Sequence, residues 1–517
     1  MSAFGAGSVR AALLASAALI AAAVMAPGAV QAQTKVTDKW ITVILPGEPH
    51  DIEGCEASRS VQGRVAKFNI VESLVQKNPA DGVLKPRLAT SWKQVDPLTW
   101  EFKLREGVTF HDGAPFNATA VKRSLDRTLG KTIVCQDKTK FFNGVTAEVI
   151  AVDPTTLHIK TTRPDAIMPM RLANTTIVGP NAPMDKPTLD TVGTGPYAFD
   201  SWQPGQQILL KRNDKWWGPK PQAEGVRYVW RNESAVRAAM VKIGEADIAS
   251  TIAQQEATDP KMDFSYLNSE TTMLRYDAMQ PPMNDIRVRR AMNMAVDLEA
   301  MKGTLLPKDV IPATQVVMPS IPGHNHELDK RTHVYNPTKA KQLLAEAKAS
   351  GVPVDTEILF LASTYHYQNS VEVAEAVMNM YKAVGLNMKI QTLEAGQYAK
   401  WTSKPFPEKA QPSILQASHD NNSGDPVFSV FQRFACDGAS SNFCSPELDK
   451  EIARVSDLGG DARVKGWQEI MRTIYEDMEP VLFMYHMVGF TRVGPRVDFK
   501  PDVTTNAEIR IEEIKFK

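Results

Sequence analysis

The side chains that could act in acid–base or nucleophilic chemistry match no catalytic spacing. His111 and Asp112 are adjacent, as an acid–base pair could be, and Glu245 and Asp247 stand two apart, as a pair of glycosidase carboxylates might. We interpret His111 and Asp112 as turn and packing residues, and Glu245 and Asp247 as a solvated or capping pair. The chain has no Gly-x-Ser-x-Gly or His-Glu-x-x-His motif and no Cys-His signature. We therefore expect no enzyme activity, and a secreted peptide hydrolase is the rival class.

A second group of small residues could suggest phosphate chemistry. Gly193 and Gly195 flank Thr194, and Pro196 follows. This spacing fits neither the Gly-x-x-x-x-Gly-Lys nor the Gly-x-Gly-x-x-Gly motif of phosphate-binding loops. We interpret the run as a crossing of two chain segments where only small residues fit.

Four cysteines could form disulfides or bind a metal. Cys436 and Cys444 are eight positions apart, which suits a short disulfide ring, and Cys55 and Cys135 would then pair by exclusion. Three connectivities are possible, and the sequence does not choose between them. No Cys-x-x-Cys spacing supports a metal, so we expect disulfides and no metal or cofactor.

The N-terminus resembles a secretory signal. Arg10 precedes an apolar run over residues 11–26, Pro27 and Gly28 break that run, and Val30-Gln31-Ala32 offers a cleavage site. The run has 16 residues, whereas a membrane-spanning helix needs about 20. We predict a signal peptide over residues 1–32, cleaved after Ala32; the alternative is a retained N-terminal anchor.

Length and charge limit the remaining possibilities. With 517 residues the chain is too long for one compact core, so we expect two or three domains. Lysine and arginine together number 59, as do aspartate and glutamate, so we expect no nucleic-acid partner.

The spacing of apolar residues predicts alternating strands and helices. Residues 100–104 alternate between apolar and charged, as in a half-buried strand, and residues 108–110 resume the alternation, which predicts a hairpin. Asn117 is placed to cap a helix that follows. Another helix is expected over residues 60–76. Strand and helix patterns alternate again over residues 336–390, which favours an α/β fold with a partly parallel sheet.

Three stretches carry longer motifs. The first is formed by Trp100, Phe102, Leu104, Arg105, Gly107, Val108, Phe110, His111, Asp112, Gly113, Pro115, Phe116, Ala118 and Val121. The second is the Gly-Thr-Gly-Pro-Tyr run of residues 193–197, continued at Gly205, Ile208, Leu210, Arg212, Asn213, Trp216, Trp217 and Gly218. The third covers residues 282–301. Together they resemble the signature of the large extracytoplasmic solute-binding proteins (family 5) that serve ABC importers of dipeptides, oligopeptides and nickel.

The resemblance implies a type II (class C) periplasmic-binding-protein fold with two lobes, a hinge and three domains. Lobe I would comprise residues 33–70, 184–275 and 480–517, an additional domain residues 71–183, and lobe II residues 276–479. The protein would be a periplasmic monomer that delivers a peptide or peptide-like ligand to an ABC permease and its ATPase. A chaperone with the same fold is a third class.

In such proteins the ligand lies between the lobes, where aromatic faces and polar groups replace its hydration. Residues 363–367, 397–401 and 416–425 combine these features. The candidate ligand-binding residues are therefore Tyr365, His366, Tyr367, Trp401, His419, Asp420, Asn421 and Asn422.

The last of these stretches bears on ligand charge. In the peptide-binding relatives an aspartate in the loop before an Asp-Pro pair binds the peptide's α-ammonium, and Asp425-Pro426 matches that pair. We favour Asp420 for this role. Asn422 is the alternative and would suit a neutral polar ligand; a turn that touches no ligand is a third possibility.

Two further observations concern ligand identity. The arginine that dipeptide binders place near their Pro-Tyr segment has no counterpart here, which favours a longer peptide, an opine-like conjugate or another polar solute. His366 and His419 could capture nickel, but neither belongs to a His-x-His or His-x₃-His pair.

Overall fold

The computed structural model describes residues 36–331, 334–364, 366–367, 369–408 and 411–517. Residues 38–517 form one compact unit. The predicted signal peptide and Tyr365 lie outside the described residues. Within the described part of the chain, no helix has the length and apolar character needed to cross a membrane.

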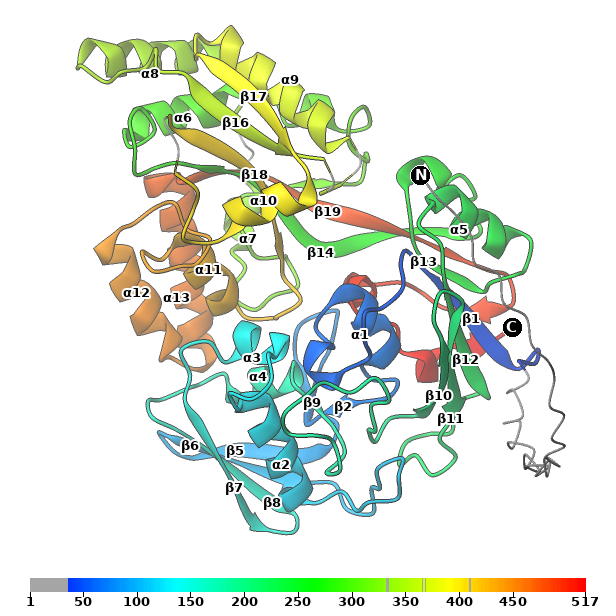
Figure 1. Ribbon diagram of the computed structural model, residues 1–517. Coiled ribbons are helices and arrows are strands. Elements are labelled where there is room, and N and C mark those ends of the chain that lie inside the picture. The colour runs from blue at the N-terminus through cyan, green and yellow to red at the C-terminus, as the bar shows by residue number, and fades with distance from the viewer. Residues whose placement is uncertain (1–35, 332–333, 365, 368, 409–410) are drawn as a thin grey trace, which may run out of the picture. The chain divides into compact units, whose positions relative to one another are not determined.

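One mixed sheet of eleven strands runs through the compact unit (Figure 1). Its path in order is β10 (Tyr197–Gln203), β11 (Gln207–Arg212), β12 (Gly225–Trp230), β1 (Trp40–Leu45), β13 (Ile248–Ile252), β19 (Val481–Val493), β14 (Asp263–Tyr276), β18 (Ser413–Asp420), β16 (Ile358–Ser363) and β17 (Met388–Leu393). The short β15 (Ile311–Pro312) pairs with β19. Strand β1 is parallel to both neighbours, and so is β16, which agrees with the expected partly parallel sheet.

Strands β14 and β19 are the longest in the sheet and join its two ends. β19 pairs with β13 on one side and with β14 along most of its length, and the C-terminal part of β14 pairs with β18. Figure 1 shows the two strands lying side by side between the two groups of helices. We call the part around β1 and β12 the first half and the part around β16 and β17 the second half.

Helices cover both halves. The first half carries α1 (Ser60–Ala66) and α5 (Ser234–Lys242). The second half carries α6 (Ile286–Ala295), α7 (His326–Asp329), α8 (Pro337–Ala349), α9 (Ser370–Ala383), α10 (Ala395–Thr402), α11 (Pro426–Phe434), α12 (Pro446–Ser456) and α13 (Gly460–Arg472). Apolar residues at helical spacing, such as Val288, Ala291 and Met292 on α6, are buried against the strands.

A third part of the molecule is built on a separate four-stranded antiparallel sheet, which we call the small sheet. Its order is β5 (Ala89–Asp96), β6 (Thr99–Leu104), β8 (Thr156–Thr161) and β7 (Ala147–Asp153), and it packs with α2 (Ala118–Leu129), α3 (Gln136–Phe141) and α4 (Met168–Ala173). Three two-stranded pairs complete the fold: β2 (Glu72–Ser73) with β9 (Thr176–Ile177), β3 (Val75–Lys77) with β4 (Leu84–Pro86), and β20 (Val497–Asp498) with β21 (Lys515–Phe516).

The predicted α/β class is confirmed, and two local predictions are wrong. The expected hairpin arm at residues 108–110 is not a strand, because β6 pairs with β5 and β8 instead. Val108 and Phe110 are buried in the core of the small sheet, which accounts for their apolar alternation. The helix expected to reach residue 76 ends at Ala66, and Phe68 follows with a left-handed backbone (φ 61°).

The first two signature stretches meet in space. His111 Nδ1 accepts a hydrogen bond from the Gly193 amide (3.3 Å), and His111 Nε2 donates to the Gly195 carbonyl (2.9 Å). A Cβ on either glycine would approach the backbone of residues 69–71 to within 2.3 Å, so only glycine fits. Asp112 accepts from the Ala114 amide in a turn. His111 and Asp112 are therefore packing and turn residues.

Of the three possible cysteine connectivities, the structure has the one that contains the short ring. Cys55 pairs with Cys135, and Cys436 pairs with Cys444. The first bridge joins the loop after β1 to the start of α3, and the second closes a short loop after α11.

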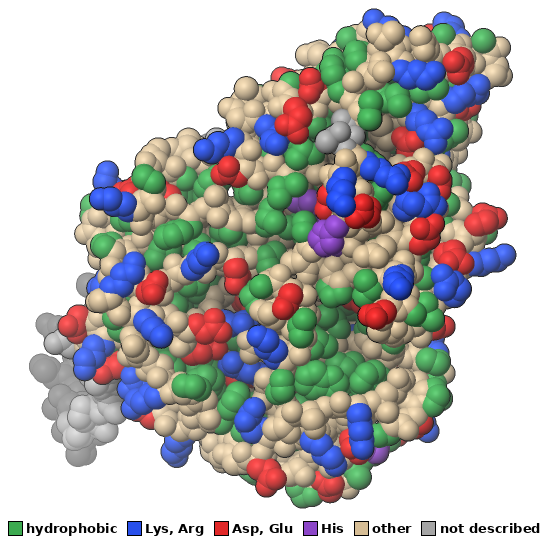
Figure 2. All heavy atoms as spheres, turned by 180° about the vertical axis from the view of Figure 1, so that it is seen from behind, with side chains coloured by type: hydrophobic (Ala, Val, Ile, Leu, Met, Phe, Trp, Pro, Cys, Tyr) green, Lys and Arg blue, Asp and Glu red, His purple; other side chains and the backbone are tan. Residues whose placement is uncertain are grey.

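On the face seen in Figure 2, basic and acidic side chains are interspersed, in keeping with the balanced composition.

A buried ion pair also ties the small sheet to the first half. The two terminal guanidinium nitrogens of Arg127, on α2, donate to the carboxylate of Glu53, at 2.7 and 2.9 Å. Arg127 and Glu53 are each 1% exposed. Because water does not reach either side chain, each charge depends on the other for its stabilisation.

We predict that Arg127→Met lowers the free energy of unfolding by about 3–5 kcal/mol, since it leaves the Glu53 carboxylate buried without its partner. Urea denaturation would measure the loss. Lys122→Met is the matched control on the same helix: its pair with Asp126 is 42% exposed on each side, so the change should stay below about 0.5 kcal/mol. Similar losses in the two variants would contradict the role given to the buried pair.

Candidate functional site

The candidate site lies where the pairing of β14 and β19 is interrupted. Leu267 is opposite Val488 and Thr271 is opposite His486, so three residues of β14 stand opposite one residue of β19. Ser269, in the middle, has a left-handed backbone (φ 68°) and is fully buried. Its hydroxyl donates to Asp420 Oδ1 (3.0 Å), at the end of β18. The bulge thus brings the end of β18 to the junction of the two halves and the small sheet.

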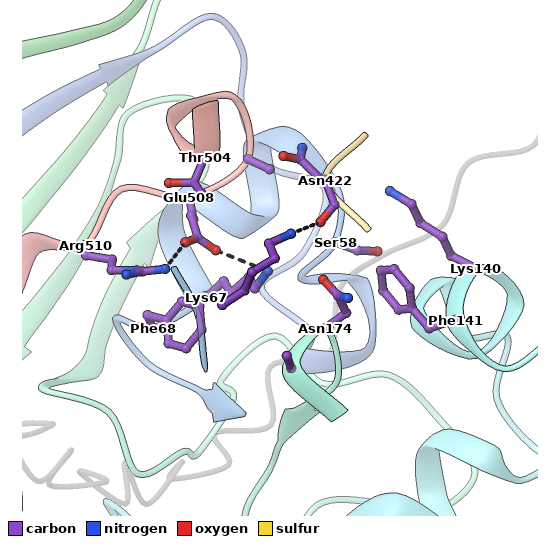
Figure 3. A pocket seen from close by; sticks show the side chains of 13 residues that line it. Ser58, Lys67, Phe68, Lys140, Phe141, Asn174, Asn422, Thr504, Glu508 and Arg510 are labelled. Carbon is purple, nitrogen blue, oxygen red and sulfur yellow. Dashed lines mark hydrogen bonds and ion pairs between the residues drawn. The ribbon is translucent and has the colours of Figure 1, made fainter. Parts of the chain in front are cut away.

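Two small cavities flank this junction, each with a volume of about 20 Å³, room for one or two water molecules. The first is lined by side chains from the first half, the small sheet and the second half (Figure 3). They include Lys67, Phe68, Lys77, Lys140, Phe141, Asn174, Asn422, Glu508 and Arg510. The second cavity shares Lys77 and Asn422 and adds Met318, Ile321 and Asn421.

Lys77 lies between the two cavities. It ends β3, and its ammonium donates to the main-chain carbonyl of Asn422, in the loop after β18. Burial lowers the pKa of Lys77 to about 7, and repulsion from the Lys67 ammonium adds to the shift. Lys77 is therefore charged below about pH 7, and the protein itself stabilises that charge poorly.

Glu508 balances two of the other cations. Lys67 Nζ lies 3.1 Å from Glu508 Oε2, and an Arg510 guanidinium nitrogen donates to Glu508 Oε1 at 2.5 Å. Figure 3 shows Lys67 and Arg510 reaching Glu508 from two sides. Although burial alone would raise it, these cations hold the pKa of Glu508 at about 2. The Arg510 guanidinium also lies over the Phe68 ring, 4.7 Å from its centre.

Asp420 accepts three hydrogen bonds. Its donors are Lys140 Nζ on α3 (3.0 Å), the Ser269 hydroxyl (3.0 Å) and the Asn422 amide (2.9 Å). Burial alone would raise the pKa of Asp420, but the Lys140 ammonium and the Asn422 amide lower it to about 2. Asp420 is thus ionised at neutral pH and already holds an ammonium group.

The described cations of the junction are not all paired with carboxylates. Lys67 and Arg510 pair with Glu508, Arg510 also lies 3.5 Å from Glu513, and Lys140 pairs with Asp420, so Lys77 is the cation of the described junction that has no carboxylate partner. Burial and Asp420 raise the pKa of Glu270, opposite Asp420 in the sheet, to about 7, so Glu270 is mostly neutral below that pH, where Lys77 is charged. An incompletely paired cation attracts an anionic group.

Three of the predicted ligand residues lie at this junction. Asp420 and Asn422 contact lysines from the other parts of the molecule, as described. Asn421 lines the second cavity, but its amide nitrogen donates to the Ser269 carbonyl and the Thr271 hydroxyl, both at 3.1 Å. Asn421 therefore holds the bulge of β14.

The other described candidates lie inside the second half, and neither cavity is lined by any of them. His419 accepts from Arg433 Nε (3.3 Å) and contacts the Ser429 hydroxyl (2.7 Å), and burial lowers its pKa to about 3. His366 contacts the Ser418 hydroxyl (3.0 Å) and packs against Tyr398. The Tyr367 hydroxyl accepts from Gln416 (2.9 Å), and Trp401 packs beside Leu361 and Leu393.

The sequence analysis missed the cations of the junction. Lys67, Lys77, Lys140 and Arg510 stand in no motif, and their sequence neighbours are not unusual. They come from segments up to 443 positions apart (67 to 510), so only the folded chain brings them together.

Comparison with known proteins identifies the family of this chain. Residues 83–440 match the bacterial extracellular solute-binding proteins, family 5 Middle. The glutathione-binding protein GsiB of Escherichia coli (strain K12) is 31% identical over 329 residues, an alignment that spans 61% of this chain and 62% of that protein's length.

Solved structures share the fold over almost the whole chain. The periplasmic binding protein DppA from Helicobacter pylori, in complex with the peptide STSA, superposes with a TM-score of 0.74 at 19% identity, covering 92% of this chain and 98% of that one. The binding protein AgaA from A. tumefaciens R10, in complex with agropinic acid, has a TM-score of 0.73 at 23% identity and the same coverage. The chain belongs to the family 5 extracellular solute-binding proteins, as its signature stretches predicted.

Proposed function

We propose that this protein captures an acidic peptide or peptide-like solute between its two halves and delivers it to the permease and ATPase of an ABC importer. The observation that carries the proposal is Lys77, the cation of the described junction that has no carboxylate partner. Two of the relatives are named with acidic solutes, GsiB with glutathione and AgaA with agropinic acid. The protein would act in the periplasm as a monomer, after export by residues 1–32.

Capture requires the two halves to separate. Each of the two cavities at the junction has a volume of about 20 Å³, too small for a peptide, so the halves would have to move apart for a peptide to enter there. We propose residues 33–70, 184–275 and 480–517 as lobe I, residues 71–183 as its additional domain and residues 276–479 as lobe II. The bulge at Ser269 and the facing part of β19 would serve as the hinge.

The contacts across the junction suggest how a ligand is held. Lys140 occupies Asp420 as a ligand ammonium would, and Lys77 has only a carbonyl oxygen of Asn422 to bind. A zwitterionic ligand would replace both contacts: its ammonium would bind Asp420, and its carboxylate would bind Lys77 and the released Lys140. The protein then supplies binding and closure without bond chemistry; turnover of peptides by the pure protein would support the hydrolase class instead.

Lys77→Met should weaken glutathione binding by about 10-fold or more, because an ion pair in a junction with little water is lost. Isothermal titration would measure the affinity. Native mass spectrometry of the protein purified from its host would identify a ligand that it carries. The melting temperature should not fall, since burial already opposes the Lys77 charge. Lys85→Met, an exposed lysine on the paired strand β4, is the control and should bind normally. Equal affinity in all three proteins would argue against an anion site at Lys77.

Affinity for an acidic ligand should fall as the pH rises from 6 to 8.5. The pKa of Lys77 is lowered to about 7, so its charge is present below that pH and is lost above it. Titrations over this range would show the effect, and Lys77→Arg should remove the pH dependence while keeping the affinity. A flat profile in the unmodified protein would contradict the assignment.

Asp420→Ala should weaken a ligand with an α-ammonium by more than about 10-fold and leave its des-amino analogue nearly unaffected, since only the ammonium pairs with this carboxylate. Parallel titrations of the two ligands would provide the comparison. If the variant loses both equally, Asp420 supports the hinge through Ser269 rather than binding the ligand.

A further inference from the structure

A second cluster of ligand-type side chains lies outside the junction. His324, His326 and Asp329 present a nitrogen or oxygen atom each, all within 4.8 Å of one another. His324 is buried, whereas His326 and Asp329 are exposed. None of the three lines the cavities of the junction, and the function proposed above does not use them.

The geometry follows from a short loop and one helical turn. His324 and His326 are two apart, and α7 returns Asp329 to the side of His326 three positions later. Asp329 Oδ2 lies 2.8 Å from His324 Nε2 and 3.4 Å from His326 Nδ1. Ligands of a tetrahedral zinc ion lie about 3.3–3.5 Å apart, as bond lengths of about 2.0–2.2 Å require.

His324 is oriented for binding. Its Nδ1 lies 2.9 Å from the Val317 carbonyl, which can only accept, so Nδ1 carries the proton. Its Nε2 then faces the Asp329 carboxylate. Nε2 also lies 3.3 Å from the side-chain amide nitrogen of Gln315, which can donate to it. A backbone carbonyl behind Nδ1 is the usual support of a metal-binding histidine, and it leaves Nε2 as the ligand atom.

Neighbouring amides hold the loop in place. Gln315 bonds both main-chain groups of Asn325, accepting from its amide (2.8 Å) and donating to its carbonyl (3.0 Å). The Asn325 side chain donates to the Gln468 carbonyl (2.9 Å), and the Gln468 side chain donates to the His324 carbonyl (3.1 Å). The residue between the two histidines is therefore fixed from two sides, so binding a metal would cost little ordering of the chain.

Nearby positive charge is neutralised. Lys330 pairs with Glu327 (2.7 Å), and Arg331 pairs with Glu476.

His486 lies behind the cluster, with its ring centre 6.1 Å from that of His324. Its Nδ1 contacts the Thr271 hydroxyl (2.9 Å), so the cluster is packed against the strand pair β14–β19.

We propose that His324 Nε2, His326 Nδ1 and Asp329 Oδ2 bind one divalent transition-metal ion. Two imidazoles and one carboxylate suit zinc and its neighbours better than calcium or magnesium, which prefer oxygen ligands alone. Solvent reaches His326 and Asp329, so a water molecule completes the coordination.

The test uses the untagged, chelator-treated full-length protein and zinc chloride as the probe. Isothermal titration should show one equivalent bound, and cobalt chloride should give the visible absorption of a tetrahedral site. His326→Ala and Asp329→Asn should each weaken zinc binding by at least about 10-fold. The His326 side chain is 66% exposed, so that variant should keep the melting temperature of the metal-free protein.

His50→Ala is the matched control, an exposed histidine outside the cluster that should leave binding unchanged. His419→Gln separates this site from the earlier expectation of metal capture at His366 and His419 and should also bind normally. No saturable binding, or equal binding in the His326 and Asp329 variants, would overturn the proposal. Its failure would leave the solute-binding proposal standing, because glutathione titration reports on the junction alone.

Discussion

The antiparallel pairing of β14 with β19 is the constraint on which the rest of this structure depends. The two strands span fourteen and thirteen residues and belong to both halves of the sheet at once. A continuous hydrogen-bonded ladder would make the halves one rigid body. The three-against-one bulge around Ser269 interrupts it, and the interruption is buried and held by Asn421 and Asp420. In the proposed function, the point where the halves would move is therefore also the point where the proposed ligand-binding groups meet.

The electrostatics of that junction oppose stability and favour binding. Lys67, Lys77 and Lys140 repel one another where little water is present, and burial depresses the pKa of Lys77 to about 7. Asp420 and Glu508 offset part of this repulsion through short contacts. An anionic ligand would gain binding free energy at a site whose cations are incompletely paired. In the proposed function, this arrangement would let a chain of zero net charge bind an acidic solute.

The residues that identify the family act mainly in the fold. His111 bonds the glycines of the second signature stretch. Asp425, which marks the Asp-Pro pair, caps α11 and is bound by Arg463 at 2.7 and 3.0 Å. These contacts position the loop that carries Asp420 and Asn422 without touching either cavity. A sequence motif can thus identify a fold even though the motif residues do not line a ligand-binding site.

Local physics explains what the sequence determined by itself. The apolar alternation of residues 100–104, the cap at Asn117 and the tight glycines at 193 and 195 depend on near neighbours, so the strand, the helix and the crossing were predictable. Burial alone does not distinguish a strand from an extended loop, and the hairpin expected at residues 108–110 was wrong for that reason. Asp420 and Asn422 were found through a nearby motif, whereas Lys67, Lys77, Lys140 and Arg510 were not. The tertiary structure alone decided which charges converge, because electrostatic interaction depends on distance in space and is indifferent to distance along the chain.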